Sequence, residues 1–258
     1  MPRLHSDRQL RQPKGRWHIF QSLFFIFVFS LAIFFFLQSS FFKVTDIKVS
    51  GNKQLKKEDI ISLAGFKKGI NIFKANLQLA QGKVTLHPMI KQVEMTRKLP
   101  GIIIINITER KPVGMLADKG RFVVVSEDGC FVIKANSLSS INLPIITGIK
   151  LGSEGPGQKI ADENLKVALN YLLTMPLNFR AAVSEVNVSD LNNIRVFTLD
   201  RVEVRFGDNS RIAEKVRLYQ GVISQKYESR IEYIDISYKG SPVIKFTVSG
   251  DRKKQSKQ

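Results

Sequence analysis

The sequence predicts an α+β protein that begins with a single N-terminal transmembrane helix. Three observations predict this class. Residues 19–37 form an uncharged apolar run, segments that alternate apolar and polar residues recur from residue 44 onward, and segments with apolar residues at helical spacing lie between them. We expect a β-α-α-β-β unit after the anchor, and then a mixed β-sheet domain with packed helices.

The apolar run predicts a membrane anchor. As a helix, residues 19–37 would be about 28 Å long, close to the hydrocarbon thickness of a bilayer. The alternative is a cleaved signal peptide, but its apolar region is usually about 7–15 residues long and ends at a small-residue cleavage site. Gln38-Ser39-Ser40-Phe41-Phe42 is a poor site of this kind. We therefore expect an uncleaved transmembrane helix at residues 19–38.

The charge of the N-terminal tail predicts the orientation of the anchor. Residues 1–18 contain five basic side chains and one acidic side chain. The positive-inside rule places this tail in the cytoplasm, and the long C-terminal part outside it. The basic character of the C-terminal part does not oppose this, because long domains translocate largely regardless of their charge.

The first unit after the anchor is predicted from five segments. Residues 44–49 alternate as in a half-buried strand, and residues 56–64 and 74–84 carry apolar residues at helical spacing, with Gly65 and Pro88 following them. Residues 90–97 and 101–109 are predicted strands joined by a turn at Leu99-Pro100-Gly101.

The rest of the chain predicts a second domain that begins near residues 110–113. Strands are expected at residues 121–126 and 130–134, joined by the hairpin signal Glu127-Asp128-Gly129, and residues 142–157 read as loops. Asp162 is the expected N-cap of an amphipathic helix that ends at Pro176. Further strands are expected at residues 183–188, 194–198, 202–206, 233–238 and 243–248, with a helix at 211–224. The charged end after residue 250 is expected to be disordered.

The composition excludes several functions. The chain of 258 residues has a net charge of +18, but its Lys and Arg residues are spread along the sequence instead of gathering with aromatic residues on one element, which argues against nucleic-acid binding. The single cysteine, Cys130, cannot form an intramolecular disulfide and is expected to be a buried, inert thiol. Of three histidines, only His87 lies outside the tail and the anchor, and no hydrolase, zinc-protease or phosphate-loop motif occurs. We expect no enzyme activity, no metal and no cofactor.

The last two predicted strands offer a mechanism of binding. Ile234, Ile236 and Tyr238 alternate with polar positions in one strand, and Phe246 lies in the other. A terminal strand can expose unpaired N–H and C=O groups and accept a strand of another chain. The alternation alone leaves open whether this strand is instead a core strand with a covered edge.

Several short motifs, taken in order, resemble one protein family. They are the entry at residues 42–52, His87-Pro88-Met89-Ile90, Arg97-Lys98-Leu99-Pro100-Gly101, Thr108-Glu109-Arg110-Lys111-Pro112, Ser126-Glu127-Asp128-Gly129, Leu143-Pro144-Ile145-Ile146 and Tyr233-Ile234-Asp235-Ile236. Together, behind a basic tail and one anchor, they resemble the FtsQ/DivIB family of bacterial cell-division proteins, and the short tails look more like FtsQ than DivIB.

The resemblance implies a domain organisation. It implies a cytoplasmic tail at residues 1–18, a transmembrane helix at 19–38, a POTRA domain at 42–111, an FtsQ-type β domain at 112–249 and a disordered tail at 250–258. The POTRA markers are Gly51, Pro88, Arg97, Pro100, Glu109 and Pro112.

The resemblance also implies a function: a non-enzymatic scaffold at the division septum that helps recruit and regulate septal cell-wall synthesis. It would bind FtsB/DivIC-like and FtsL-like proteins through its C-terminal strands, and other divisome proteins through the POTRA domain. Aromatic residues dominate interface energetics and surface lysines can steer an acidic partner; the expected contacts are Tyr233, Ile236, Tyr238, Lys239, Ser241, Lys245 and Phe246. The alternatives are a POTRA-bearing component of protein export or outer-membrane assembly, and an envelope enzyme.

Overall fold

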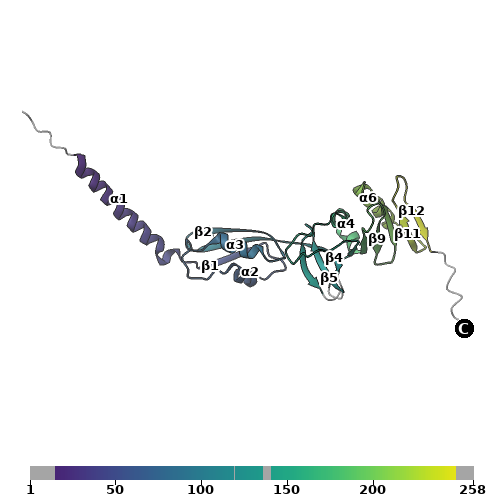
Figure 1. Ribbon diagram of the computed structural model, residues 1–258, viewed down its shortest axis with the longest axis horizontal. Helices are drawn as coiled ribbons and strands as arrows, with labels where there is room; N and C mark the ends of the chain where they lie inside the picture. The colour runs from purple at the N-terminus through teal and green to yellow at the C-terminus, as the bar shows by residue number, and fades with distance from the viewer. Residues whose placement is uncertain (1–14, 119, 136–140, 248–258) are drawn as a thin grey trace, which may run out of the picture. The chain divides into compact units, whose positions relative to one another are not determined.

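A computed structural model describes residues 15–118, 120–135 and 141–247 (Figure 1). The expected disorder after residue 250 therefore lies outside the described residues, as does most of the N-terminal tail. Contacts divide the chain into two compact units. Of the described residues, one unit comprises 15–50, 57–81 and 94–106, and the other comprises 51–56, 82–93 and those of the range 107–247.

The first element is the long helix α1, Gly15–Gln38. Within its stretch Trp17–Gln38, an 18-residue window has a mean hydropathy of 2.5, and none of that window is buried by the rest of the chain. An apolar helix with no protein around it needs an apolar solvent, so α1 has the length and surface of a membrane span. The span predicted at residues 19–38 lies within this helix.

The β-α-α-β-β order predicted for the next segment is confirmed. After a short 3₁₀ turn, η1 at Ser40–Phe42, the elements are β1 (Asp46–Ser50), α2 (Lys57–Ala64), α3 (Leu77–Thr85), β2 (Ile90–Lys98) and β3 (Ile102–Glu109). The sheet order is β1-β3-β2, with β1 parallel to β3. The helix expected from residue 74 begins only at Leu77, because the Asn76 side chain accepts the Leu79 amide at 3.0 Å and so starts the helix there.

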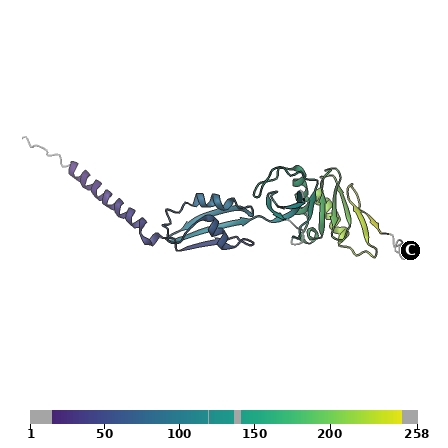
Figure 2. The same cartoon turned by 60° about the horizontal axis from the view of Figure 1, so that its bottom comes forward.

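The remaining strands form one nine-stranded sheet in the order β12-β11-β10-β9-β8-β7-β4-β5-β6. They are β4 (Pro112–Asp118), β5 (Arg121–Ser126), β6 (Phe131–Ala135), β7 (Ile145–Thr147), β8 (Val183–Asn187), β9 (Ile194–Thr198), β10 (Glu203–Gly207), β11 (Ile231–Asp235) and β12 (Val243–Phe246). Figure 2 shows the later strands side by side. The sequence prediction missed β4 and β7. A register shift between Pro112 and Gly114 interrupts β4, and β7 has three residues between parallel neighbours.

One face of this sheet is covered by α4 (Glu163–Thr174) and α6 (Ile212–Ile223), while the short α5 (Leu177–Ala181) follows α4. The predicted N-cap of α4 is confirmed, because the Asp162 side chain accepts the Leu165 amide at 3.0 Å. In the core between helices and sheet, the Phe206 ring contacts Tyr171 edge to face and Tyr219 in a tilted arrangement. The opposite face carries a smaller apolar cluster of Met115, Val124 and Val132.

Candidate functional site

The candidate site is the C-terminal edge, which we define as residues 231–247: β11, the loop after it, and β12. β12 is the terminal strand of the nine-stranded sheet and pairs antiparallel with β11. Among the residues that the structure describes, no strand pairs with the other side of β12. The predicted terminal strand therefore exists as Val243–Phe246, and no described strand covers its edge; its expected last residue, Val248, lies outside the described residues.

The backbone of β12 has one side bonded and one side available. The Thr247 amide donates to the Arg230 carbonyl at 2.8 Å, on the side of β11. Because alternate residues of a strand direct their N–H and C=O groups to opposite sides, those of Ile244 and Phe246 face away from β11. These two residues offer two donors and two acceptors to a further strand.

The predicted contact residues fall into three positions. Tyr238, Lys239 and Ser241 are exposed in the loop that joins β11 to β12, since β11 ends at Asp235 and not at Tyr238 as expected. Lys245 and Phe246 lie on β12, and Tyr233 on β11.

Ile236 does not belong to this surface. Its side chain is 1% exposed and packs in the main core, and its amide donates to the Arg205 carbonyl at 3.0 Å. The expectation that Ile236 contacts a partner is corrected by its burial. Sequence alternation placed Ile236 and Tyr238 on one face, but the strand ends before either residue.

The Phe246 ring packs against the ring of Tyr227. The two rings are 5.4 Å apart, and Phe246 remains 36% exposed. Tyr227 packs in turn against the main core. An aromatic side chain held in this way loses little rotamer freedom when a partner covers it, which favours binding.

A charged row crosses the sheet beside the edge. The Tyr233 ring lies between the Arg205 guanidinium, 4.1 Å from the ring centroid, and the Lys245 ammonium, 5.6 Å from it. Glu203 pairs with Arg205 at 3.1 Å, and Glu232 pairs with Lys245 at 3.1 Å. These contacts hold the Arg205 and Lys245 head groups over β11, on the face of the sheet that carries the Tyr233 ring.

An ion pair with one buried partner joins α6 to the residue after β10. Lys215 of α6 is completely buried, and its ammonium donates to the carboxylate and to the backbone carbonyl of Asp208, the latter at 2.8 Å. The hydrogen bond from Lys215 lowers the pKa of Asp208. Sequence reasoning missed this pair, because Lys215 lies within an ordinary charged stretch of a helix.

Of the POTRA markers, Gly51 and Glu109 have clear structural roles. Gly51 has φ of +83° and faces the Ile107 carbonyl, so a Cβ would collide with that backbone. The Glu109 carboxylate accepts the amides of Lys53 (2.8 Å), Gln54 (2.9 Å) and Leu55 (3.0 Å). Burial raises the pKa of Glu109, but the three amides outweigh it and the net pKa is lowered.

The other markers lie at a loop, a turn and a cavity. The Arg97 guanidinium donates to the carbonyls of Ile72 (3.0 Å) and Ala75 (2.8 Å). Pro100 lies in the turn between β2 and β3 and follows a cis peptide bond. Pro88 and Pro112 both line an apolar cavity of about 750 Å³.

The sequence indicated Arg110 only as part of a motif and gave it no role of its own. It donates to the carbonyls of Pro88 (2.9 Å) and Ile90, and to the Asp128 carboxylate at 3.1 Å. Three bonds from one guanidinium tie residues 88–90 to the hairpin between β5 and β6. Its place in the Glu-Arg-Lys-Pro motif was the only signal in the sequence.

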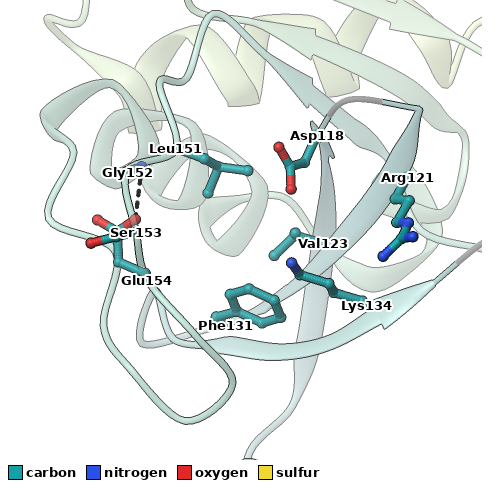
Figure 3. Close-up of a pocket in the computed structure, with 9 residues that line it drawn as sticks. All are labelled: Asp118, Arg121, Val123, Phe131, Lys134, Leu151, Gly152, Ser153 and Glu154. Atoms are coloured by element: carbon teal, nitrogen blue, oxygen red, sulfur yellow. Dashed lines mark hydrogen bonds between the residues drawn. The ribbon is translucent and has the colours of Figure 1, made fainter.

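A second cavity, of about 440 Å³, lies beside β5 and β6 (Figure 3). Arg121 and Lys134 face it together with Asp118 and Glu154, and Phe131 lies at its base. The Glu154 carboxylate accepts the Gly152 amide at 2.8 Å, so that one acid is already occupied. The side chains that line this cavity do not form a set of nucleophile, base and oxyanion donor. In the described ranges, no three His, Cys, Asp or Glu side chains cluster as metal ligands.

In the part of the chain that the structure describes, the fold is an N-terminal apolar helix that fits a membrane protein, followed by an α+β portion whose last strand has an uncovered edge. Family models then match most of the chain: "POTRA domain, FtsQ-type" at residues 42–110 and "Cell division protein FtsQ/DivIB, C-terminal" at residues 115–237. The chain belongs to the FtsQ/DivIB family of cell-division proteins. The second match ends before Tyr238 and β12.

Relatives of both names are similar to the chain. It is 26% identical over 231 residues to cell division protein DivIB of Clostridium tetani, covering 86% of each chain. It is 28% identical over 214 residues to cell division protein FtsQ of Geotalea daltonii, covering 80% of this chain and 77% of that protein. The solved major extracytoplasmic domain of DivIB from Geobacillus stearothermophilus aligns with 45% of this chain and 93% of its own length. The sequence identity is 15% and the TM-score is 0.33, a low structural similarity.

Proposed function

We propose that this protein is a non-enzymatic divisome scaffold that captures its partners by adding a strand to β12. The partners are FtsB/DivIC-like and FtsL-like division proteins, as the family resemblance implies. Other divisome proteins would bind the POTRA segment at residues 42–111. The scaffold would thereby help recruit and regulate septal cell-wall synthesis.

The main support for this function is the uncovered outer side of β12. An extended segment of a partner would bond to the N–H and C=O groups of Ile244 and Phe246, which gives affinity. Exposed Tyr238 and Phe246 would supply apolar anchors, and Lys239 and Lys245 would favour an acidic partner. Lys245 also serves as a charged residue that discourages self-association of an open edge.

We further propose that α1 remains attached and holds the domains at the division septum. The basic tail would lie in the cytoplasm and the part after α1 outside it, by the positive-inside rule. The family assignment supports a role in division over the alternative of an export or outer-membrane assembly component.

A binding experiment tests the strand addition. Phe246→Ala removes the ring and keeps the amide, whereas Phe246→Pro removes the outward amide as well. In pull-downs with an FtsB/DivIC-like partner, Phe246→Ala or Tyr238→Ala should weaken binding about tenfold or more, as expected for a central aromatic anchor. Phe246→Pro should cost about a further fivefold, since one net hydrogen bond contributes about 1 kcal/mol.

The control is Leu177→Ala, which truncates another exposed apolar side chain, on α5. It should bind normally, and all variants should unfold as the natural protein does. Normal binding by both Tyr238→Ala and Phe246→Pro would refute strand addition at β12, even though the family assignment would stand.

A further inference from the structure

The end of α1 is capped by a loop far along the sequence. We call residues 69–75 the cap loop. The Asn71 side-chain amide donates to the Leu37 carbonyl at 2.7 Å, and the Lys74 ammonium lies 3.5 Å from the Gln38 side-chain oxygen. The last carbonyls of a helix lack partners within it, and near a hydrocarbon phase no water supplies them. The cap loop fills that need.

The cap loop is held firmly. The Ile72 amide donates to the Phe42 carbonyl, and the Gly69 amide to the Val44 carbonyl, both at 2.8 Å. From the other side, Arg97 donates to the carbonyls of Ile72 and Ala75. The loop therefore has a fixed position relative to the end of the span.

Exposed aromatic rings lie at the level of the last turns of α1. The Phe42 ring is 5.3 Å from Phe36 within the span, and 5.2 Å from Phe73 of the cap loop. Phe41 stacks on Phe36 at 6.1 Å. Phe41 is 61% and Phe73 44% exposed, an unfavourable state in water that a membrane interface relieves.

A groove of about 430 Å³ lies between the cap loop and α1. Its apolar walls are Phe34, Leu37 and Phe73, and its polar end carries Gln38, Asn71 and Lys74. Phe34 and Gln38 are about 6 Å apart along the helix axis, so the groove crosses from hydrocarbon depth to headgroup depth. Among the described residues, no acidic side chain pairs with Lys74.

We propose that this groove binds one phospholipid of the leaflet that faces the exported part, with a preference for an anionic headgroup. The acyl chain lies against Phe34, Leu37 and Phe73, and Lys74 binds the phosphate. The inference rests on the membrane anchor proposed above. It adds a lipid site that fixes how the first exported unit meets the membrane surface.

Tryptophan fluorescence tests the site, because Trp17 is the only tryptophan in the chain. The full-length protein is placed in vesicles of phosphatidylcholine and phosphatidylglycerol whose acyl chains are brominated near the headgroup. Three single-tryptophan versions are compared: the natural protein, W17F with F73W, and W17F with L79W. Leu79 is exposed on α3 and does not line the groove. Bromine should quench the natural protein and the F73W version, but not the L79W version.

The headgroup preference is tested by placing bromine on only one of the two lipids. Phosphatidylglycerol should be enriched about fivefold at the F73W reporter, as expected for one lysine near anionic lipid. K74E should abolish this enrichment. The control K48E changes an exposed lysine on β1, away from the groove, and should preserve it.

The outcomes separate this proposal from the anchor. Unquenched Trp17 would overturn the membrane span, and the lipid site with it. Quenching of Trp17, with F73W quenched no more than L79W, would overturn the groove alone. Equal quenching by the two lipids would overturn the anionic headgroup and its assignment to Lys74.

Discussion

The two ends of the Lys215–Asp208 ion pair should differ strongly in their effect on stability. Lys215 is completely buried, whereas the Asp208 side chain is 51% exposed. Asp208→Ala leaves a buried ammonium with only a neutral carbonyl acceptor. Breaking a buried pair costs about 3–5 kcal/mol, and because water partly screens this carboxylate we expect about 2–3 kcal/mol.

Lys215→Met should be much milder. The Asp208 carboxylate can hydrate, and the Asp208 backbone carbonyl keeps its bond from the Tyr171 hydroxyl at 3.0 Å. Methionine fills most of the space of the lysine stem, so the expected cost is about 1 kcal/mol. The matched control is Lys245→Met, whose pair with Glu232 is about half exposed on both sides and should change stability by less than about 0.5 kcal/mol.

The measurement is urea unfolding of the full chain in detergent, with thermal unfolding beside it. Asp208→Ala should lower the Tm by roughly 5–10 °C. The pKa of Asp208 is lowered by the bond from Lys215, so the pair should contribute fully above the ordinary value of 3.8 and less as the pH falls below it. Equal losses in Asp208→Ala and Lys215→Met, or a loss in Asp208→Ala no larger than the control, would refute the reasoning.

Two further predictions concern the Glu109 carboxylate and the Cys130 thiol. Glu109→Gln should destabilise the protein by about 1–2 kcal/mol, because a neutral amide accepts the three backbone N–H groups more weakly. Since the folded-state pKa of Glu109 is lowered, its contribution should be present above the ordinary value of 4.5 and fade on acidification; an unchanged acid limb in urea unfolding of Glu109→Gln would contradict this. Cys130 is 5% exposed and its pKa is raised by burial, so it should react with a thiol reagent much more slowly in the native state than in denaturant; similar rates, followed by absorbance, would show that the site opens readily.

The candidate site was predictable in part. Aromatic and basic residues in the last two strands indicated a binding edge, and Phe246, Lys245 and Tyr238 are all exposed there. Ile236 was assigned wrongly, since alternation gives the face of a residue within a strand but not where pairing ends. Arg205 and Lys245 both contact the Tyr233 ring, and these contacts join three strands. No local sequence pattern predicts them.

The sequence by itself determined the elements whose cause is local. An uncharged run long enough for a bilayer predicts α1, apolar spacing predicts α4 and α6, and Asp162 predicts the start of α4. Only the tertiary structure decided that β7 exists between parallel neighbours, that β12 is the last strand of the sheet, and that Asn71 reaches the carbonyl of Leu37. The reason is physical: periodicity and capping depend on residues a few positions apart, whereas strand order, burial of Lys215 and capping of the span depend on contacts between distant segments.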